Sequence, residues 1–92
     1  MEELPEVSVI ITTKNEEENI EKCLESVITQ RYSLKKIEII VVDNNSTDET
    51  KKRVLKYTDK VYNFGPERSA QRNFGARKAN GRYILYLSLI HI

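Results

Sequence analysis

The sequence predicts an α/β fold of three layers, α/β/α, around a mainly parallel sheet of about four strands. Val7 to Thr13 and Ile37 to Val42 are short apolar runs rich in β-branched residues. Each run stops at a polar turn, as strands that are buried on both faces do. Stretches with helical spacing of apolar residues separate the strand patterns, which gives the order β-α-β-α-β-α-β. Strands that alternate with single helices form parallel sheets with helices on both faces.

The first strand, Val7 to Thr13, leads into a predicted helix from about Glu16 to Thr29. Asn15 is a good N-cap, and Glu18 follows three residues later, as in a capping box. The apolar residues that recur at helical spacing are Ile20, Leu24, Val27 and Ile28. We therefore expect an amphipathic helix whose apolar face lies on the sheet, with Cys23 as a small core residue.

The second strand, Ile37 to Val42, stops on the carboxylate of Asp43. Ser46 and Glu49 then form a second capping-box pattern, which predicts a helix that runs to about Tyr57. The residues expected on its buried face are Val54 and Leu55.

The remaining elements are a short strand, a helix and a last strand. The short strand is predicted from Lys60 to Asn63, and the turn Phe64-Gly65-Pro66 follows it. The helix runs from about Glu67 to Asn80 and ends because Gly81 occupies the C′ position. The last strand is predicted from Tyr83 to Leu87.

Length, charge and cysteine content narrow the classes of protein. The 92 residues suffice for one small domain or a piece of a larger one. The net charge of +1, from 15 basic and 14 acidic residues, gives no electrostatic reason to expect nucleic acid or an anionic membrane as a partner. The single cysteine allows no internal disulfide, and the acidic start is unlike a signal peptide, so we expect a cytoplasmic location. The longest apolar stretch has about ten residues, whereas a membrane span needs roughly 20.

The three strand-to-helix loops, 12–16, 43–48 and 63–68, are expected at one end of the sheet, where parallel sheets bind ligands. Acid and amide groups of the first two loops suit the polar edge of a base and a ribose. Guanidinium groups of the third suit the oxygens of a diphosphate. We therefore expect a nucleotide-type ligand rather than a simple metal site. The candidate binding residues are Thr12, Thr13, Asn15, Glu16, Asp43, Asn45, Ser46, Asp48, Arg68 and Arg72.

Other chemistries lack their signatures. No Gly-x-Gly-x-x-Gly follows the first strand, and no Gly-Lys-Thr or Gly-Lys-Ser phosphate loop occurs. Cys23 and His91 have no third partner for a Cys-His nucleophile and cannot build a zinc site. A flavodoxin-like signalling domain with Asp43 as phosphoacceptor is a weaker alternative. Such domains require an acidic pair after the first strand and a lysine after the last strand. Here Lys14-Asn15-Glu16 follows the first strand and Ser88-Leu89 follows the last, and neither segment fits well.

Three segments, in order and at matching spacings, resemble one known family. VSVIITTKNEEENIEKCLESV, IEIIVVDNNSTDET and GPERSAQRNFGARKANGRYILYL are similar to the N-terminal, nucleotide-binding half of a family 2 glycosyltransferase. The resemblance covers roughly Val7 to Leu87 and implies a Rossmann-like GT-A fold. It also implies transfer of a sugar from a nucleotide-diphosphate-sugar donor, UDP- or GDP-linked, to an acceptor.

The resemblance implies roles for individual residues. The stretch Thr12–Glu16 resembles the loop that lines the nucleoside pocket, and Asp43 corresponds to the acid that hydrogen-bonds the base, commonly uracil. The residues that resemble the family's polar turn after this acid are Asn45, Ser46 and Asp48. Arg68 lies near the family's basic residue at the diphosphate. Arg72-Asn73 resembles an Arg-Asn pair on the third helix, in which we expect Asn73 to be buried.

The sequence departs from the family after the last strand. There the family places an Asp-x-Asp motif whose carboxylates hold a divalent metal, Mn²⁺ or Mg²⁺, at the donor diphosphate. Here Ser88-Leu89-Ile90-His91-Ile92 follows, without an acid. No catalytic or metal-binding residue is therefore assigned to the chain, because the family's catalytic base and acceptor-binding half also lie beyond these motifs.

We expect residues 1–92 to form a single partial domain, with 88–92 as a tail foreign to the family. The fragment alone is expected to be inactive, and the alternative to a transferase is a non-catalytic nucleotide-binding fragment or an inactive truncated product. Membrane association is expected only through sequence beyond this chain. One sheet edge beside the apolar tail should be exposed, so we expect the isolated chain to self-associate.

Overall fold

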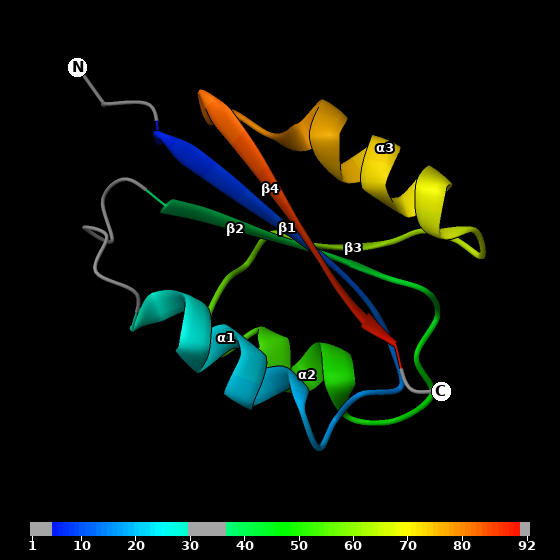
Figure 1. The fold of residues 1–92 in the computed structure, drawn as a ribbon. Coiled ribbons are helices and arrows are strands. Elements are labelled where there is room, and N and C mark those ends of the chain that lie inside the picture. The colour runs from blue at the N-terminus through cyan, green and yellow to red at the C-terminus, as the bar shows by residue number, and fades with distance from the viewer. Residues whose placement is uncertain (1–4, 30–36, 91–92) are drawn as a thin grey trace.

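The computed structural model describes residues 5–29 and 37–90 (Figure 1). The elements are β1 (Val7–Lys14), α1 (Ile20–Ile28), β2 (Ile37–Asp43), α2 (Thr50–Val54), β3 (Val61–Asn63), α3 (Arg68–Lys78) and β4 (Tyr83–Ile90). The strands form one sheet in the order β3-β2-β1-β4, and each neighbouring pair is parallel. In Figure 1, α3 covers one face of the sheet, and α1 and α2 cover the other. The predicted three-layer α/β/α class is confirmed.

The core lies on both faces of the two central strands, because successive side chains of a strand point to opposite faces. The strand residues in the core on the α1 and α2 face are Val9, Ile11 and Val41. Those on the α3 face are Ile10, Ile40 and Val42. Each of these six side chains is at most 2% exposed, and burying one stabilises the fold by about 1.5–3 kcal/mol. The core therefore holds β1 and β2 firmly in register up to the loops that follow them.

The first helix begins later than predicted. α1 begins at Ile20, and the turn that precedes it is closed by the N–H groups of Asn19 and Ile20, which donate to the backbone oxygen of Glu16. Asn15 has a φ of 50°, in the left-handed region, and its side chain accepts a hydrogen bond from the N–H of Thr47. The capping box predicted for the start of this helix is therefore wrong, because Asn15 bonds the neighbouring loop instead of its own helix.

The second helix is also shorter than predicted. α2 begins at Thr50 after Glu49 as N-cap, and Ser46 caps no helix because its N–H and hydroxyl both donate to Asp43. Val54 is buried as predicted. Leu55 is 60% exposed, which contradicts its predicted burial, because the helix ends one residue before it.

α3 lies close to the sheet because Gly75 faces it. A Cβ at Gly75 would lie 2.5 Å from Cγ2 of Ile10 and 3.3 Å from Cγ2 of Val42. Gln71, one turn earlier on the same face, is 3% exposed and its Nε2 donates to the backbone oxygen of Val42 at 3.0 Å. Asn73 is exposed, so its predicted burial is wrong and Gln71 is the buried amide of this helix.

Gly81 does not end the helix in the way predicted. Ala79 is the C-cap of α3, and no glycine among the described residues has a positive φ. A Cβ at Gly81 would lie 2.5 Å from the backbone nitrogen of Ser8. The glycine is therefore required by a close approach to β1 rather than by a left-handed turn.

β4 is an edge strand and extends further than predicted. It pairs with β1 as far as Ile90, so Ser88 to Ile90 continue the strand. His91 and Ile92, the end of the predicted tail, lie outside the described residues. The exposed apolar residues of this strand, 41–58% accessible, are Tyr83, Ile84, Leu85 and Tyr86.

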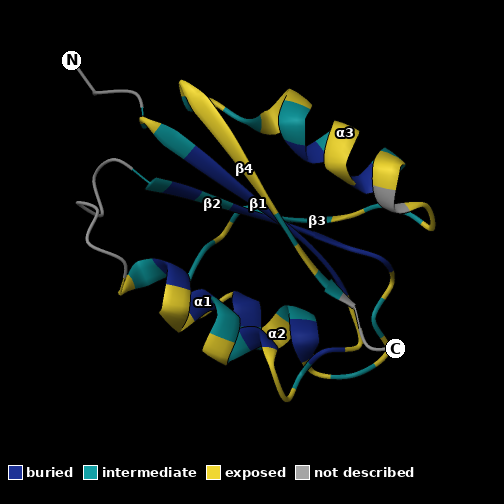
Figure 2. Ribbon diagram, viewed as in Figure 1, coloured by how far each residue is buried: buried dark blue, intermediate teal, exposed yellow. Residues whose placement is uncertain are grey.

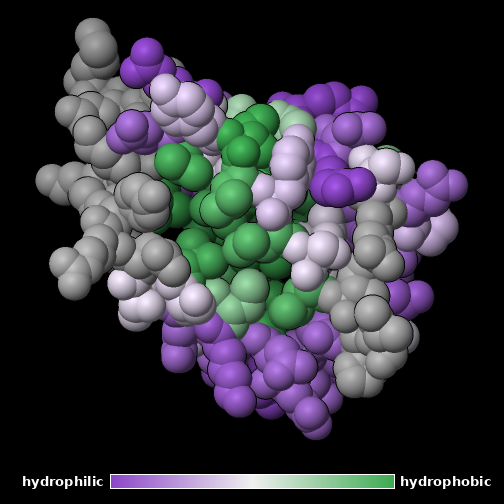
Figure 3. Space-filling model, viewed as in Figure 1, coloured by the Kyte–Doolittle hydropathy of each residue, from purple (hydrophilic) through white to green (hydrophobic). Residues whose placement is uncertain are grey.

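The outer edge of β4 carries the exposed apolar surface that the sequence predicts. Figure 2 shows β4 exposed along much of its length, and Figure 3 shows hydrophobic side chains gathered on the face that looks toward the viewer. Beside it, on the α1 side, Val9, Val27 and Leu87 line part of a hollow of about 350 Å³. Within residues 5–29 and 37–90, no helix combines the length and the apolar character needed to cross a bilayer.

Candidate functional site

Three loops meet at the carboxyl edge of the sheet, where β1, β2 and β3 end. The strand register places Thr13 beside Asp43, and Asp43 beside Asn63. The N–H of Asn44 donates to the backbone oxygen of Thr13, and the N–H of Phe64 donates to that of Asp43, both at 2.9 Å. The prediction that these loops share one end of the sheet is confirmed.

Asp43 lies beneath the loop that follows β2 and is fully buried, with 0% exposure. The N–H of Ser46 donates to Oδ2 at 2.8 Å, and the Ser46 hydroxyl donates to Oδ1 at 2.6 Å. Each carboxylate oxygen therefore already accepts a hydrogen bond from the residue three positions later. These two hydrogen bonds from Ser46 close the loop after β2 onto its last strand residue.

Asn15 joins the first loop to the second. Its N–H donates to the Ser46 hydroxyl oxygen at 2.8 Å, and its Oδ1 accepts from the N–H of Thr47 at 2.8 Å. The left-handed φ of 50° brings both groups toward the second loop. Asparagine is one of the few residues that adopts this conformation readily.

A second set of contacts links the start of α1 to the start of α2. The N–H of Glu16 donates to the Thr50 hydroxyl oxygen at 2.9 Å, and the Thr50 hydroxyl donates to Oδ1 of Asp48. The N–H of Glu17 donates to the other oxygen of Asp48 at 3.3 Å. Burial raises the pKa of Asp48, but the hydrogen bonds from Thr50 and Glu17 outweigh it, so the pKa lies below its usual value. Asp48 is therefore held as a carboxylate that braces both helix starts.

The third loop is tied to the second by amide groups. Asn45 and Asn63 exchange two hydrogen bonds, of 3.0 Å and 2.6 Å. Asn45 has a φ of 49°, so it is a second left-handed asparagine in these loops. We call the three loops, residues 12–16, 43–48 and 63–68, the rim. Asn44 packs under Gly65, where a Cβ would lie 2.4 Å from its Oδ1.

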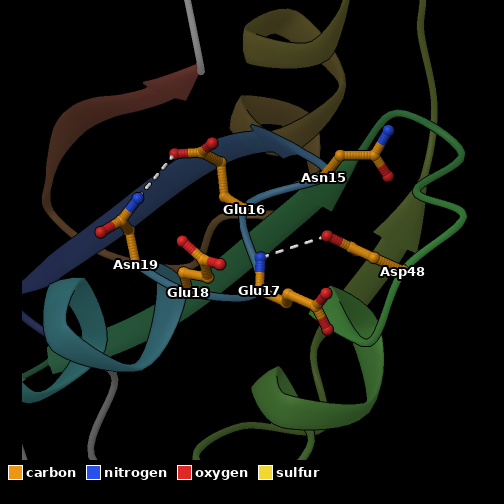
Figure 4. Close-up of a pocket in the computed structure, with 6 residues that line it drawn as sticks. All are labelled: Asn15, Glu16, Glu17, Glu18, Asn19 and Asp48. Carbon is orange, nitrogen blue, oxygen red and sulfur yellow. Dashed lines mark hydrogen bonds between the residues drawn. The ribbon is translucent and has the colours of Figure 1, made fainter.

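A shallow acidic pocket of about 210 Å³ opens beside the first two loops (Figure 4). Its lining residues are Asn15, Glu16, Glu17, Glu18, Asn19 and Asp48. Figure 4 shows the carboxylate of Glu16 with Nδ2 of Asn19 beside it, at 3.5 Å. Carboxylates accept hydrogen bonds from hydroxyl and N–H donors, so this pocket suits a ribose or a base edge and repels phosphate.

The described residues do not fit a divalent metal. Within residues 5–29 and 37–90 there is no group of three or more His, Cys, Asp or Glu side chains that could hold one. β4 pairs with β1 in a register that places Ser88 beside Thr12. The Thr12 hydroxyl donates to the Ser88 hydroxyl at 3.3 Å. A neutral hydroxyl pair thus stands at this part of the edge.

The remaining predicted site residues are Thr13, Arg68 and Arg72. Thr13 is 1% exposed, and its hydroxyl oxygen has no hydrogen-bond partner in the described part of the chain. Arg72 lies on α3 and is exposed. Arg68 is the first residue of α3, and its side chain lies outside what the structure describes. The binding role of each predicted site residue stays a prediction.

Sequence reasoning missed three residues that brace the rim, namely Glu17, Thr50 and Asn63. Thr50, the first residue of α2, is 0% exposed, and its hydroxyl links the N–H of Glu16 to Asp48. The short spacing of Asp48 and Thr50 was a usable signal, because an aspartate side chain commonly bonds backbone and hydroxyl groups two residues later. The amide pair of Asn63 had no signal, because its partner lies 18 residues away in the sequence.

Comparisons with known proteins agree on one family. The sequence model of the family described as "Glycosyl transferase family 2" matches residues 8–88. The chain is 40% identical over 91 residues to glycosyltransferase AglE of Haloferax volcanii, covering 91% of this chain and 30% of that protein. It is 32% identical to the GalNAc(5)-diNAcBac-PP-undecaprenol beta-1,3-glucosyltransferase of Campylobacter jejuni, covering 91% of this chain and 29% of that protein. The chain thus spans less than a third of the length of these relatives.

Solved structures give the same result. The crystal structure of S. aureus TarS 1–349 matches with a TM-score of 0.82 and 31% identity, covering 90% of this chain and 27% of that one. TarS 1–349 in complex with UDP-GlcNAc matches with a TM-score of 0.79 and 33% identity, covering 90% of this chain and 26% of that one. The match of the family model, residues 8–88, spans the segments on which the sequence resemblance rests.

Proposed function

The chain belongs to glycosyl transferase family 2, and on that basis we propose that it forms the nucleotide-binding part of a sugar transferase. The donor in this proposal is a UDP-linked sugar, and the rim at the carboxyl edge binds its nucleoside diphosphate. The observation that carries the proposal is the convergence of the three loops at this edge, held by hydrogen bonds between them. A TarS structure contains UDP-GlcNAc, which supports the choice of donor.

The charges around the rim suggest how the nucleotide lies. The acidic pocket of Figure 4 faces the nucleoside, because its carboxylates accept from ribose hydroxyl groups and from base N–H groups. We assign the diphosphate to Arg72, which is exposed on α3, since guanidinium groups match phosphate oxygens in charge and geometry. In this arrangement the nucleoside end of the ligand meets negative charge on the protein, and the diphosphate end meets positive charge.

The divalent metal that the family resemblance implies has no ligand set among the described residues, so no step of this proposal passes through it. The chain's own part is to bind and orient the nucleotide. An alternative is that the chain is a non-catalytic nucleotide-binding fragment or an inactive product. A purified 92-residue chain that transferred sugar would overturn that alternative.

Calorimetric titration of the chain with UDP and UMP tests the proposal. We expect saturable 1:1 binding of UDP, with UMP bound more weakly because it lacks the second phosphate. Arg72→Gln should weaken UDP about tenfold, the loss of one charge-assisted contact. The matched control is Arg82→Gln, an exposed arginine that precedes β4 at the opposite end of the sheet, and it should bind like the wild type. Absence of UDP binding, or equal effects of the two variants, would overturn the proposal.

A further inference from the structure

We propose that Asp43 is a positioning residue of the nucleotide rim, which acts through Ser46 on the first loop and does not itself touch the nucleotide. The inference rests on the proposed function of this rim. It departs from the family resemblance, which implies a direct contact between Asp43 and the base. The burial of Asp43 and the engagement of both its carboxylate oxygens carry the inference.

The carboxylate of Asp43 is closed off from solvent. Asp43 is 0% exposed, and each of its oxygens accepts from Ser46, at 2.8 Å and 2.6 Å. A ligand that reached Asp43 would have to displace the Ser46 hydroxyl or its N–H. Both are hydrogen bonds to a carboxylate, which are stronger than those between neutral groups.

The carboxylate of Asp43 fixes the direction in which the Ser46 hydroxyl points its proton. A hydroxyl carries one proton, and here that proton is given to Oδ1 of Asp43. The lone pairs of the same oxygen are therefore left to accept, and one accepts the N–H of Asn15 at 2.8 Å. Without the carboxylate the hydroxyl could rotate, and its oxygen would no longer be fixed as an acceptor.

Asn15 links this pair to the surface of the rim. Asn15 is exposed, and its left-handed backbone is held by the hydrogen bond from its N–H and by the one that Oδ1 accepts from Thr47. Asn15 also lines the acidic pocket. The buried carboxylate thus fixes an exposed loop through two successive hydrogen bonds, from Asn15 to Ser46 and from Ser46 to Asp43.

UDP affinity and amide exchange of four proteins test this relay: wild type, Asp43→Asn, Ser46→Ala and the double variant. Each is measured where circular dichroism shows it folded. Each single variant should weaken UDP about tenfold, and the double variant should be no weaker than either, because both break the same chain of contacts. Hydrogen exchange of the Asn15 amide should accelerate about tenfold in both single variants, Asp43→Asn and Ser46→Ala. Ser46→Thr keeps the hydroxyl and should restore both values, and Ser26→Ala, an exposed serine on α1, should match the wild type.

A direct contact gives a different pattern. If Asp43→Asn weakens UDP while Ser46→Ala binds like the wild type, or if the two effects add, Asp43 is a ligand contact and the proposal is overturned. If the wild type binds no UDP, the proposed function is overturned. The exchange measurement still decides the relay, since an unchanged Asn15 amide in Asp43→Asn rejects it.

Discussion

Replacing Glu38 by glutamine should destabilise the fold more than any comparable change on the surface. Glu38 lies on β2 at the amino end of the sheet, opposite the loops, and its side chain is 2% exposed. It accepts hydrogen bonds from the Ser8 hydroxyl at 2.5 Å, from the Lys60 ammonium at 2.5 Å, and from the N–H and Nδ2 of Asn80 at 2.8 Å and 3.0 Å. One carboxylate thus joins four segments of the chain.

The lowered pKa of Glu38 gives the size of its contribution to the free energy of unfolding. Burial raises this pKa, but the hydrogen bonds from Lys60, Ser8 and Asn80 outweigh it and lower the pKa from 4.5 to about 2. A difference of about 2.5 units at 1.36 kcal/mol per unit corresponds to about 3 kcal/mol. Lys60 is 41% exposed, and water screens its charge, so about 3 kcal/mol is an upper bound. Because the folded pKa is the lower one, this stability is present above about pH 4.5 and is lost as the pH falls toward 2.

Urea denaturation at pH 7 and at pH 3 measures the effect. We expect Glu38→Gln to lose about 2–3 kcal/mol at pH 7 and clearly less at pH 3, where the wild type has begun to lose the same contribution. The matched control, Glu18→Gln, changes an exposed glutamate before α1 and should stay within about 0.5 kcal/mol of the wild type. A loss at pH 7 no larger than that of the control, or a loss that does not shrink at pH 3, would refute the reasoning.

Three further changes follow from the packing. Gly75→Ala should lower the free energy of unfolding by about 1–3 kcal/mol in thermal melts, despite alanine's higher helix propensity, because its Cβ would meet Ile10 at 2.5 Å; an increase in stability would show that the helix can move away. Asn15→Gly keeps the left-handed backbone and should cost about 1 kcal/mol for the lost side-chain acceptor, whereas Asn15→Ala should cost about 1 kcal/mol more; equal losses would contradict this. Leu85→Lys places a charge on the exposed edge of β4 and should reduce self-association in light scattering; a wild type that stays a monodisperse monomer would contradict the predicted aggregation.

The sequence predicts the sheet and the location of the loops because both follow from local rules. The apolar runs Val7–Thr13 and Ile37–Val42 identify the central strands, and the handedness of crossovers brings their loops to one edge. Element order, parallel pairing and the apolar face of α1 are all confirmed. These features depend on side-chain periodicity and chain connectivity, which any single sequence displays.

The loop contacts could not be predicted in the same way. Asn15 and Ser46 both carry the signature of a helix N-cap, yet each bonds a partner outside its own helix. The choice between a local cap and a contact 31 or 32 residues away depends on the distance between two loops, which only the folded sheet fixes. Likewise, Glu38 stands in an apolar run without any sign that Ser8, Lys60 and Asn80 would surround it.

The central claim is that the loops at the carboxyl edge form a nucleotide site, and amide NMR signals during a UDP titration test it most directly. The account predicts saturable shifts of the Asn15, Ser46 and Thr47 amides, which lie in the rim. Amides at the opposite end of the sheet, such as Glu38 and Gly81, should not move. The absence of any shift, or shifts of equal size at both ends of the sheet, would contradict the account.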